Sequence, residues 1–597
     1  MPREWSEPQL MRMIKAMCHE SFYESGASID ESLGIYVGWT ALKNSFADGM
    51  PIHNEGGDVA LTFSGEEYAD PEVVCGLKQR GHSLSEAQPS YLVHLYEEDP
   101  NFPACLNGMF HGLLTDRTRG TATLFNDRYG MHRVYYHKSK EAFYFAGEAK
   151  AILAVRPELR TPSPQGLAEF VTCSCVLEDR TIFKDIHVLP AASAWIFRNA
   201  AIERKGTYFE PSEWEHQTPL DPETYYQELK SALLRSLKGY FTGPGRTGVA
   251  LTGGMDTRVI MAWHKAPSGS LPCYTFGGMF RECQDVRLAR KVARACQQTH
   301  QVIKVGDEFL KRFPHYAERS VYLTEGGVDV YRSSDLYVSE KAREIAPAKV
   351  VGTYGSEIVR HAVMFKPMPP ADGLFRPEFL AHVHQARETY ASIRCAHPVT
   401  FAAFRQSPWY HHGILALEQT QLTVRSPYLN DNFVRTVYRA PSSNNGNGDI
   451  RLRLIGDGSP VLRRIPSDRG VGGASGYLLS AILHGFQEFT FKAEYAYDYG
   501  MPQWVAWADH LFSPLHLERL FLGRHKFLHY RVWYRDVLAQ YVREMLLDPL
   551  TLARPYLERK SLEIIVSGHL RGDRNYTTAI HKMLTLELLH RLFFDPA

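Results

Sequence analysis

The pattern of apolar and polar positions divides the chain into two parts with different expected secondary structure. In residues 34 to 210, short apolar runs alternate with turn residues, and two helical stretches lie near residues 71–80 and 89–97. The expected strands are Gly34–Trp39, Val59–Phe63, Ala122–Phe125, Val134–His137 and Ala142–Phe145. Many strands with few helices favour an α+β part built of stacked sheets.

From residue 222 the pattern changes. Leucines and Phe241 recur every four residues over Pro222–Phe241, which predicts an amphipathic helix. Strands then alternate with helices that begin at Asp256, Asp285 and Phe309. The expected strands are Val249–Thr252, Cys273–Phe276, Val302–Val305 and Lys349–Thr353. This alternation predicts an α/β doubly wound parallel sheet, in which ligands bind at the carboxyl ends of the strands.

The last part of the chain has a helical pattern. Ser442–Gly448 indicates a flexible loop, and from Phe486 the sequence is rich in aromatic residues. The apolar run Leu586–Phe594 predicts a final helix packed on the parallel-sheet part. We therefore expect the α/β sheet to be followed by a helical C-terminal part.

Composition places the chain among globular proteins with several domains. Its 597 residues exceed one ordinary core, with 44% hydrophobic and 22% charged residues. The formal net charge of +1 argues against a broad nucleic-acid surface. No apolar run approaches the roughly 20 residues of a membrane helix, and no signal core follows Met1–Trp5. We expect a cytoplasmic protein with neither nucleic-acid nor membrane partners.

The nine cysteines are few for so long a chain, which favours reduced thiols over a disulfide framework. Cys173 and Cys175 form a C-x-C pair with no matching pair at zinc spacing. We expect them to be small buried residues on a strand rather than metal ligands.

One stretch, Gly248–Thr257, carries recognisable chemistry. It reads as a buried strand, a tight turn at Gly253-Gly254 and the start of a helix. Unpaired N–H groups at the helix start and the Thr252 and Thr257 hydroxyls could bind phosphate, which the glycines allow to approach closely. Asp256 would repel bare phosphate, so its carboxylate implies a divalent cation. The alternative is an ordinary strand–turn–helix with glycines for packing.

Motifs in the first part resemble the glutaminase domain of asparagine synthetases. Asn126–Tyr136 resembles R-D-R-x-G-x-x-P-L-Y-Y, and Phe145–Leu153 resembles F-A-S-E-x-K-A-L. Ser64–Tyr68 and Leu106–Phe110 stand where that family has N-G-E-I-Y and L-x-G-M-F-A. The resemblance implies Ntn-hydrolase-like stacked sheets in a glutaminase-like (class II amidotransferase) domain over residues 1–210, and an ATP-dependent synthetase domain over residues 211–597.

The same part departs from the family at its nucleophile. The family hydrolyses glutamine with an N-terminal cysteine whose free α-amine acts as the base. This chain begins Met1-Pro2, Cys18 is the nearest thiol, and Ser64 replaces the asparagine of the oxyanion site. We expect a retained domain without glutaminase activity that shapes the acceptor side of the synthetase site. The alternative is a start codon further upstream that supplies the cysteine.

In the second part, Thr252–Thr257 resembles the S-G-G-x-D-S pyrophosphatase loop of asparagine synthetases and related ATP pyrophosphatases. Thr353–Glu357 stands at the family's G-x-G-x-D. The resemblance implies ATP and Mg²⁺ as cofactors, with Asp256 and Glu357 as metal ligands. The implied ATP-binding residues are Leu251, Thr252, Gly253, Gly254, Asp256, Thr257, Phe276 and Gly352.

Three catalytic candidates follow from the resemblance. Tyr354 is similar to a tyrosine that takes part in ring closure in the β-lactam synthetase branch; alternatively it is an aromatic residue at a strand end. Glu418 lies in a segment resembling E-x-R-x-P-F-L-D; alternatively it is an exposed helix carboxylate. Arg469 stands where the family has a lysine, and Arg451–Leu454 falls at its K-x-x-L-R. A guanidinium can stabilise anionic charge but cannot easily donate a proton.

The resemblance implies a ligase that adenylates a carboxylate (aspartate or a related amino acid), releases pyrophosphate and forms an amide with ammonia or an amine. Its partner would be a small amino-acid-like molecule, and a homodimer stays open. One alternative is an intramolecular lactam- or macrolactam-forming synthetase, as in β-lactam synthetase and lasso-peptide cyclases. Others are a nucleotide-binding pseudoenzyme and a nucleic-acid-modifying ATP pyrophosphatase, the latter disfavoured by the near-neutral charge.

Overall fold

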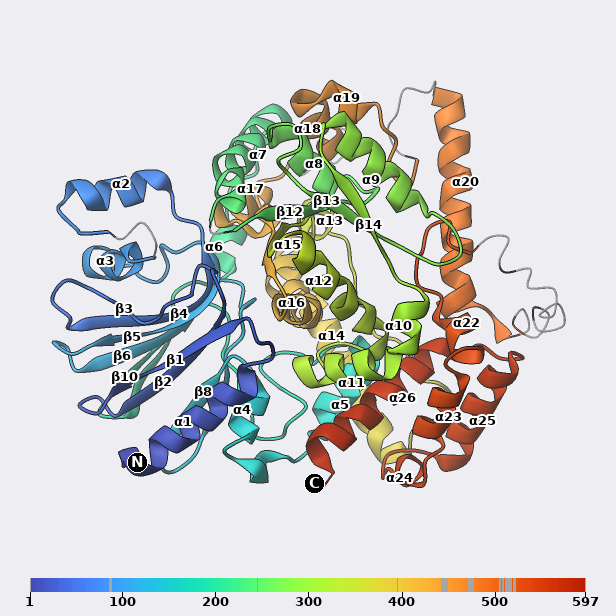
Figure 1. Cartoon of the computed structure of the whole chain (residues 1–597), viewed down its shortest axis with the longest axis horizontal. Helices are drawn as coiled ribbons and strands as arrows, with labels where there is room; N and C mark the ends of the chain where they lie inside the picture. Colours follow the sequence, from blue (N-terminus) through green and yellow to red (C-terminus); the bar gives the residue numbers. More distant parts are fainter. Residues whose placement is uncertain are drawn as a thin grey trace.

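The computed structural model describes residues 2–84, 89–243, 245–394, 396–441, 449–470, 477–503, 506, 509, 518 and 522–595, with side chains from 477 to 483 left aside. The loop expected over Ser442–Gly448 lies outside these residues. We call residues 2–210 the N-terminal lobe and residues 211–595 the C-terminal lobe. In Figure 1 the N-terminal lobe forms the left side of the molecule, and the C-terminal lobe the centre and right.

The N-terminal lobe contains antiparallel sheets, as the sequence predicts. Its main sheet has six strands in the order β11-β10-β6-β5-β4-β3, next to the hairpin β1-β2 and the three-stranded sheet β8-β7-β9. Its elements are α1 (Arg3–Met17), β1 (Tyr23–Asp30), β2 (Ile35–Leu42), β3 (Ile52–His53), β4 (Val59–Glu67), α2 (Pro71–Gln79), α3 (Tyr91–Glu98), β5 (Gly108–Asp116), β6 (Thr121–Asn126), β7 (Tyr135–Lys138), β8 (Phe143–Ala146), α4 (Ala149–Leu153), α5 (Pro164–Cys173), β9 (His187–Val188), β10 (Ser193–Arg198) and β11 (Ala201–Thr207).

Alternation along β4 explains how the main sheet packs. Val59, Leu61 and Phe63 are buried at every second position, and the Phe63 ring stacks on Phe110 of β5 with centroids 5.3 Å apart. A strand with one apolar face is fixed in register, because a one-residue slip would turn that face to solvent. Helix α1 and strand β1 precede the first expected strand and were not predicted.

The C-terminal lobe is built on a five-stranded sheet in the order β14-β13-β12-β15-β16, whose neighbours are all parallel. Helices cover both faces, which confirms the expected doubly wound sheet (Figure 1). The elements that matter here are α7 (Pro222–Leu237), β12 (Thr247–Ala250), α8 (Asp256–Trp263), β13 (Cys273–Gly277), α9 (Gln284–Ala295), β14 (His300–Lys304), α11 (Phe313–Thr324), α12 (Ser333–Ile345), β15 (Ala348–Val350), α13 (Gly355–Arg360), α16 (His412–Gln419), β16 (Thr423–Arg425) and α18 (Ile450–Gly458).

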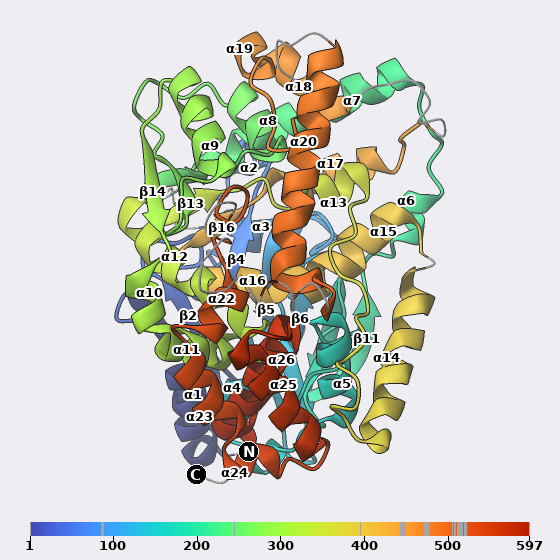
Figure 2. The same ribbon diagram turned by 90° about the vertical axis from the view of Figure 1, so that its right-hand side faces the viewer.

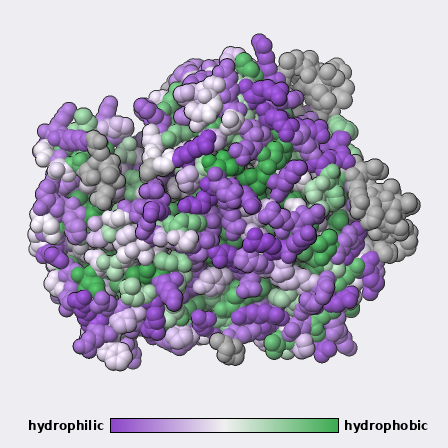
Figure 3. Space-filling view, in the orientation of Figure 1, coloured by the Kyte–Doolittle hydropathy of each residue, from purple (hydrophilic) through white to green (hydrophobic). Residues whose placement is uncertain are grey.

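The last part of the chain is helical, as expected. Helix α20 (Tyr477–Tyr495) stands upright at the right side of the molecule in Figure 1 and faces the viewer in Figure 2. Below it lies the bundle of α22 (Tyr530–Arg535), α23 (Ala539–Leu546), α25 (Arg559–Arg571) and α26 (Thr577–Leu589). Helix α26 is buried over most of its length and packs on α11 of the same lobe. Among the helices described, none combines the length and the hydropathy needed to cross a bilayer. The face drawn in Figure 3 is mainly hydrophilic, with apolar patches scattered over it.

The strand expected around Cys173 and Cys175 is a wrong prediction. Helix α5 begins with Ser163 as its N-cap and Pro164 in its first turn, and it ends at Cys173. The apolar run is buried on all sides, and such a run does not distinguish a strand from a buried helix by periodicity. Both thiols are buried and free, as expected for small core residues.

Buried polar contacts join the two lobes. Arg425 of β16 makes a two-pronged ion pair with Glu66 of β4, with N–O distances of 2.8 and 2.6 Å. Arg128 reaches Asp431 at 2.9 Å, and the Lys150 backbone N–H donates to Glu325 at 2.6 Å. Because these charges are buried, they fix how the lobes meet and therefore how the N-terminal sheets face the parallel sheet.

Candidate active site at the carboxyl ends of the parallel strands

The expected phosphate loop leaves the carboxyl end of β12 and enters α8. The Gly253 N–H is already taken, because it donates to Asp285 Oδ1 at 2.8 Å. The Gly254 N–H makes a longer bond of 3.3 Å to the Thr252 hydroxyl, and Thr252 is exposed. The open side of the turn therefore presents Thr252 and Gly254.

The glycines of this region differ in what surrounds them. A Cβ on Gly253 would lie 2.8 Å from Asp285 Oδ1, and one on Gly352 would lie 2.5 Å from the Thr257 backbone nitrogen. These two glycines allow close packing against Asp285 and Thr257, and Thr257 is buried against Gly352. A Cβ on Gly254 would meet only the Thr252 hydroxyl, at 3.3 Å. The packing alternative therefore holds for Gly253 and Gly352, while Gly254 keeps room for a ligand.

Asp256 lies at the first turn of α8 with both carboxylate oxygens engaged. Arg451 Nη1 donates to Oδ1 and the Ser356 hydroxyl to Oδ2, each at 2.7 Å. Arg451 is itself buried and held by Asp449 through bonds of 2.9 and 2.6 Å. Arg451 was not among the predicted site residues, although it begins the segment that resembles K-x-x-L-R.

Glu357 of α13 faces the same place from the neighbouring strand end. It is 6% exposed, and burial together with the nearby Asp256 carboxylate raises its pKa to about 7. Its nearest basic group is His411 Nε2 at 3.5 Å, but burial lowers the pKa of His411 to about 3, so that ring is neutral. The Glu357 charge therefore lacks a full counter-charge, and a cation shared with Asp256 would supply one. The two carboxylates fit a Mg²⁺ site in which Asp256 would contact both the cation and Arg451.

The catalytic candidates Tyr354 and Glu418 lie next to this pair. Tyr354 is buried with φ +75°, a strained conformation for a bulky residue, and its ring meets His411 edge-on. Burial, with Glu418 and Glu357 nearby, raises the pKa of Tyr354 above its ordinary value. Glu418 forms an ion pair with Lys349 of β15, with an N–O distance of 2.7 Å. Its carboxylate is mostly buried, so the exposed-helix alternative does not hold, and Lys349 is a neighbour that the sequence analysis missed.

Arg469 points away from these groups. Its guanidinium bonds Glu488 of α20 at 2.7 Å and lies 3.5 Å from the centre of the Phe491 ring. The adjacent Asp468 backbone bonds the Gly253 carbonyl at 3.1 Å, so the segment borders the loop although the Arg469 side chain leaves it.

Phe276, one of the expected ATP-binding residues, lies at the end of β13. The Phe276 ring is half-buried and faces Phe527, with centroids 6.0 Å apart. A Cβ on Gly278 would lie 2.8 Å from the Phe527 carbonyl oxygen, so this later segment covers the strand end. Leu251 is buried below, and its carbonyl accepts a bond from Thr275 at 2.9 Å. No motif near Phe527 in the sequence predicted this contact.

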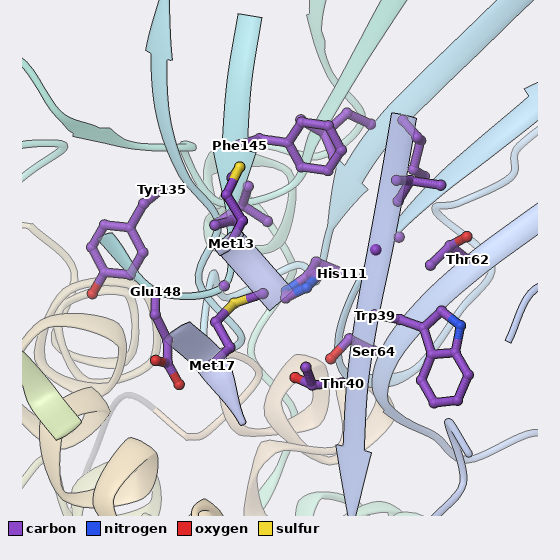
Figure 4. A pocket seen from close by; sticks show the side chains of 18 of the residues that line it. Met13, Met17, Trp39, Thr40, Thr62, Ser64, His111, Tyr135, Phe145 and Glu148 are labelled. Atoms are coloured by element: carbon purple, nitrogen blue, oxygen red, sulfur yellow. The ribbon is translucent and has the colours of Figure 1, made fainter. Parts of the chain in front are cut away.

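A cavity of about 420 Å³ lies in the N-terminal lobe and opens toward the C-terminal lobe, where Glu325, Gln419 and Thr420 line it. In Figure 4, Met13 and Met17 of α1 lie on one side of His111, and Ser64 and Trp39 lie on the other. No cysteine is among the described residues that line it.

Ser64, His111 and His132 form a small uncharged network in the wall of this cavity. The Ser64 hydroxyl bonds His132 Nε2 at 2.8 Å, and the His111 ring stacks on His132. Burial lowers the pKa of His111 to about 4 and that of His132 well below its ordinary value. Both imidazoles are therefore neutral near pH 7, and Ser64 is held by a ring rather than aimed freely into the cavity.

Comparison with known proteins shows which proteins the chain resembles. Residues 2–209 match the family model described as glutamine amidotransferase domain. "Asparagine synthetase [glutamine-hydrolyzing] 1" of Bacillus subtilis is 22% identical over 48% of this chain and 46% of its own length. "Probable asparagine synthetase [glutamine-hydrolyzing]" of Schizosaccharomyces pombe is 24% identical over 42% of this chain and 41% of its own length. The chain is therefore similar in sequence to a glutamine amidotransferase domain and to asparagine synthetases.

The family resemblance seen in the motifs is thus confirmed, while the matched stretches span less than half of each of these two asparagine synthetases. Among solved structures, a glutamine phosphoribosylpyrophosphate amidotransferase of B. subtilis matches 50% of this chain and 78% of its own, with 9% identity and a TM-score of 0.25. That score is too low to support an argument.

Proposed function

We propose that the chain is an ATP-dependent carbon–nitrogen ligase that adenylates the carboxylate of a small amino-acid-like substrate, releases pyrophosphate and forms an amide. The observation that carries the proposal is the pair Asp256 and Glu357, which lie together beside the Gly-Gly turn although they come from different strand ends. A lone glycine turn is common, but one flanked by a buried acid whose pKa is raised is not expected from packing alone.

Each group has a definite task in this proposal. The Gly254 N–H and the Thr252 hydroxyl bind phosphate oxygens at the open side of the turn. Asp256 and Glu357 would hold Mg²⁺, which neutralises phosphate charge when bound. Arg451, fixed by Asp449, keeps Asp256 oriented and adds positive charge next to that carboxylate.

Amide formation requires that the attacking nitrogen lose a proton. Glu418 is a carboxylate held by Lys349 and can accept that proton, while Tyr354, a neutral phenol whose pKa burial raises further, can donate a hydrogen bond. Since no described residue lining the N-terminal cavity is a cysteine, we propose that the nitrogen comes from free ammonia or from an amine rather than from glutamine hydrolysis. The cytoplasmic location and the homodimer remain predictions.

The test is isotope exchange of pyrophosphate into ATP with the full chain, screened over aspartate and other amino-carboxylates, with glutamate release from glutamine measured in parallel. We expect exchange with at least one carboxylate and no glutamate release. Absence of exchange with every candidate would favour a nucleotide-binding pseudoenzyme. Glutamate release would overturn the view of the N-terminal lobe.

A second candidate, an intramolecular amide-forming synthetase, is favoured by the strained Tyr354 beside Glu418. Replacing Tyr354 by Phe keeps the ring against His411 and removes the hydroxyl. We expect Tyr354→Phe to keep pyrophosphate exchange within about twofold and to slow amide formation by about 10²-fold, as for loss of an acid–base group. Equal loss of both activities would instead assign Tyr354 a role in packing.

A further inference from the structure

The outer edge of the N-terminal lobe gathers two histidines and two carboxylates that the proposed function does not use. Glu55 lies in the turn between β3 and β4, His82 follows α2, and His94 and Glu97 lie on α3. Each side chain offers one ligand atom, and the four atoms lie within 4.8 Å of one another. Three chain segments far apart in sequence therefore converge on one point.

The distances suit a small cation. His94 Nδ1 lies 2.8 Å from Glu97 Oε2 and 3.6 Å from Glu55 Oε2. The ligands of a tetrahedral Zn²⁺ site, with metal–nitrogen bonds of about 2.0–2.1 Å, lie about 3.3 Å apart, so the two separations fall on either side of that value. The centroids of the His82 and His94 rings lie 4.4 Å apart, so the two rings are in contact.

Surrounding contacts orient these side chains. The Ser83 N–H donates to Glu55 Oε1 at 2.9 Å, and Asn54 Nδ2 donates to Glu97 Oε1 at 2.7 Å. His82 Nε2 is bonded to Glu98 Oε1 at 2.6 Å. Hydrogen bonds of this kind, above all from a histidine ring N–H to a carboxylate, are typical of the layer around a metal's ligands.

The charge of the cluster also favours a cation. Among the described residues, neither Glu55 nor Glu97 has an ion pair with lysine or arginine, whereas the neighbouring Glu98 pairs with Arg80. His94 is 1% exposed, so its ring is held between carboxylates away from solvent. A divalent cation bound by the neutral rings would balance the charge of both carboxylates.

We propose that Glu55, His82, His94 and Glu97 bind one Zn²⁺ ion. Two imidazole nitrogens favour Zn²⁺ over Mg²⁺ and Ca²⁺, which prefer oxygen ligands. Four protein ligands close the coordination sphere, which is typical of a structural rather than a catalytic zinc. The ion fastens the β3–β4 turn, the segment after α2 and helix α3 to one another.

The test is equilibrium dialysis of the full, chelator-treated chain against Zn²⁺, with exposed thiols alkylated so that cysteines cannot contribute. We expect one tight Zn²⁺ per chain. His82→Ala and Glu55→Gln should each weaken binding at least about tenfold, since each removes one ligand. His187→Ala is the matched control, because His187 is exposed and also lies near an acid, Asp179, at 3.9 Å.

Two further measurements separate binding from misfolding. In the presence of chelator, the Glu55→Gln and wild-type chains should unfold at the same temperature, and Zn²⁺ should raise only the wild-type midpoint. Co²⁺ in place of Zn²⁺ should give a tetrahedral visible absorption band that is lost in His82→Ala. Absence of a tight Zn²⁺ in the wild type, or binding unchanged in both variants, would overturn the proposal.

Discussion

Asp256 and Glu357 are neighbours in space but differ in the charge of the groups that contact them. Asp256 is compensated by Arg451 and Ser356, whereas Glu357 has a neutral histidine as its nearest basic neighbour. The sequence could indicate both acids, because each occupies a motif position at the end of a strand. It could not indicate Arg451 or Lys349 as partners, since those contacts depend on how α18 packs beside α8 and how α16 packs beside β15.

The raised pKa of Glu357 predicts a pH-dependent stability. Between its ordinary value of 4.5 and about 7, the folded state binds more protons at this site than the unfolded state, so the free energy of unfolding falls as pH rises. Glu357→Gln removes this cost, which is on the order of 3 kcal/mol. We expect the variant to unfold at a higher temperature than the wild type at pH 8, and the gap to vanish below pH 4.5. Thermal melts in chelator measure it; a gap that is constant with pH would contradict it.

Asp256 gives the complementary prediction, which rests on the proposed function. Asp256→Asn keeps the shape but removes the charge that would hold the cation, so AMP formation should fall by at least about 10²-fold, the loss typical of a key electrostatic group. The fold should persist, because Arg451 stays bonded to Asp449. Asp457→Asn, an exposed acid on the same helix as Arg451, is the control and should keep full activity. Wild-type turnover of Asp256→Asn would exclude the cation role.

At the scale of elements, the site depends on how closely β15 approaches the start of α8. The alternation of strands and helices predicted this parallel sheet, because apolar runs of strand length were separated by helical periods. Strand β16 was missed, since Thr423–Arg425 is too short to give a pattern. Helix α5 was mistaken for a strand because it is buried all round. Contacts such as Phe527 over β13 join segments that are far apart in sequence, and no local pattern encodes them.

The close approach of β15 and α8 leads to a third prediction. In Gly352→Ala the added Cβ would meet the backbone of Thr257 and Asp256, at 2.5 and 2.9 Å, so α8 must move away from the strand. We expect a loss of about 1–3 kcal/mol in stability, as for overpacking, and a large loss of AMP formation. Gly239→Ala is the control, since nothing lies within 4 Å of its Cβ position. Thermal melts and pyrophosphate exchange measure both; equal behaviour of the two variants would mean that this contact is unimportant.

At the scale of the whole molecule, the two lobes share a buried boundary. Residues of α16, the helix that carries Glu418, line part of the N-terminal cavity, so this lobe lies against an element of the proposed site. The sequence predicted two parts and their fold classes, but not the surface where they meet. That surface is polar and buried, and its partners, such as Glu66 and Arg425, lie 359 positions apart in the chain.

The Glu66–Arg425 pair should therefore hold the lobes together. Glu66→Gln leaves the Arg425 guanidinium, whose side chain is 4% exposed, without its counter-charge, and breaking one partner of such a buried pair costs about 3–5 kcal/mol. Because Arg425 also holds the Tyr240 and Thr242 carbonyls, it stays in the lobe boundary and carries its charge there. We expect a lower unfolding temperature and faster proteolysis between the lobes. Glu228→Gln breaks an equally short but exposed pair with Arg439 and should cost less than about 1 kcal/mol. If the two variants melted alike, the buried pair would not be what couples the lobes.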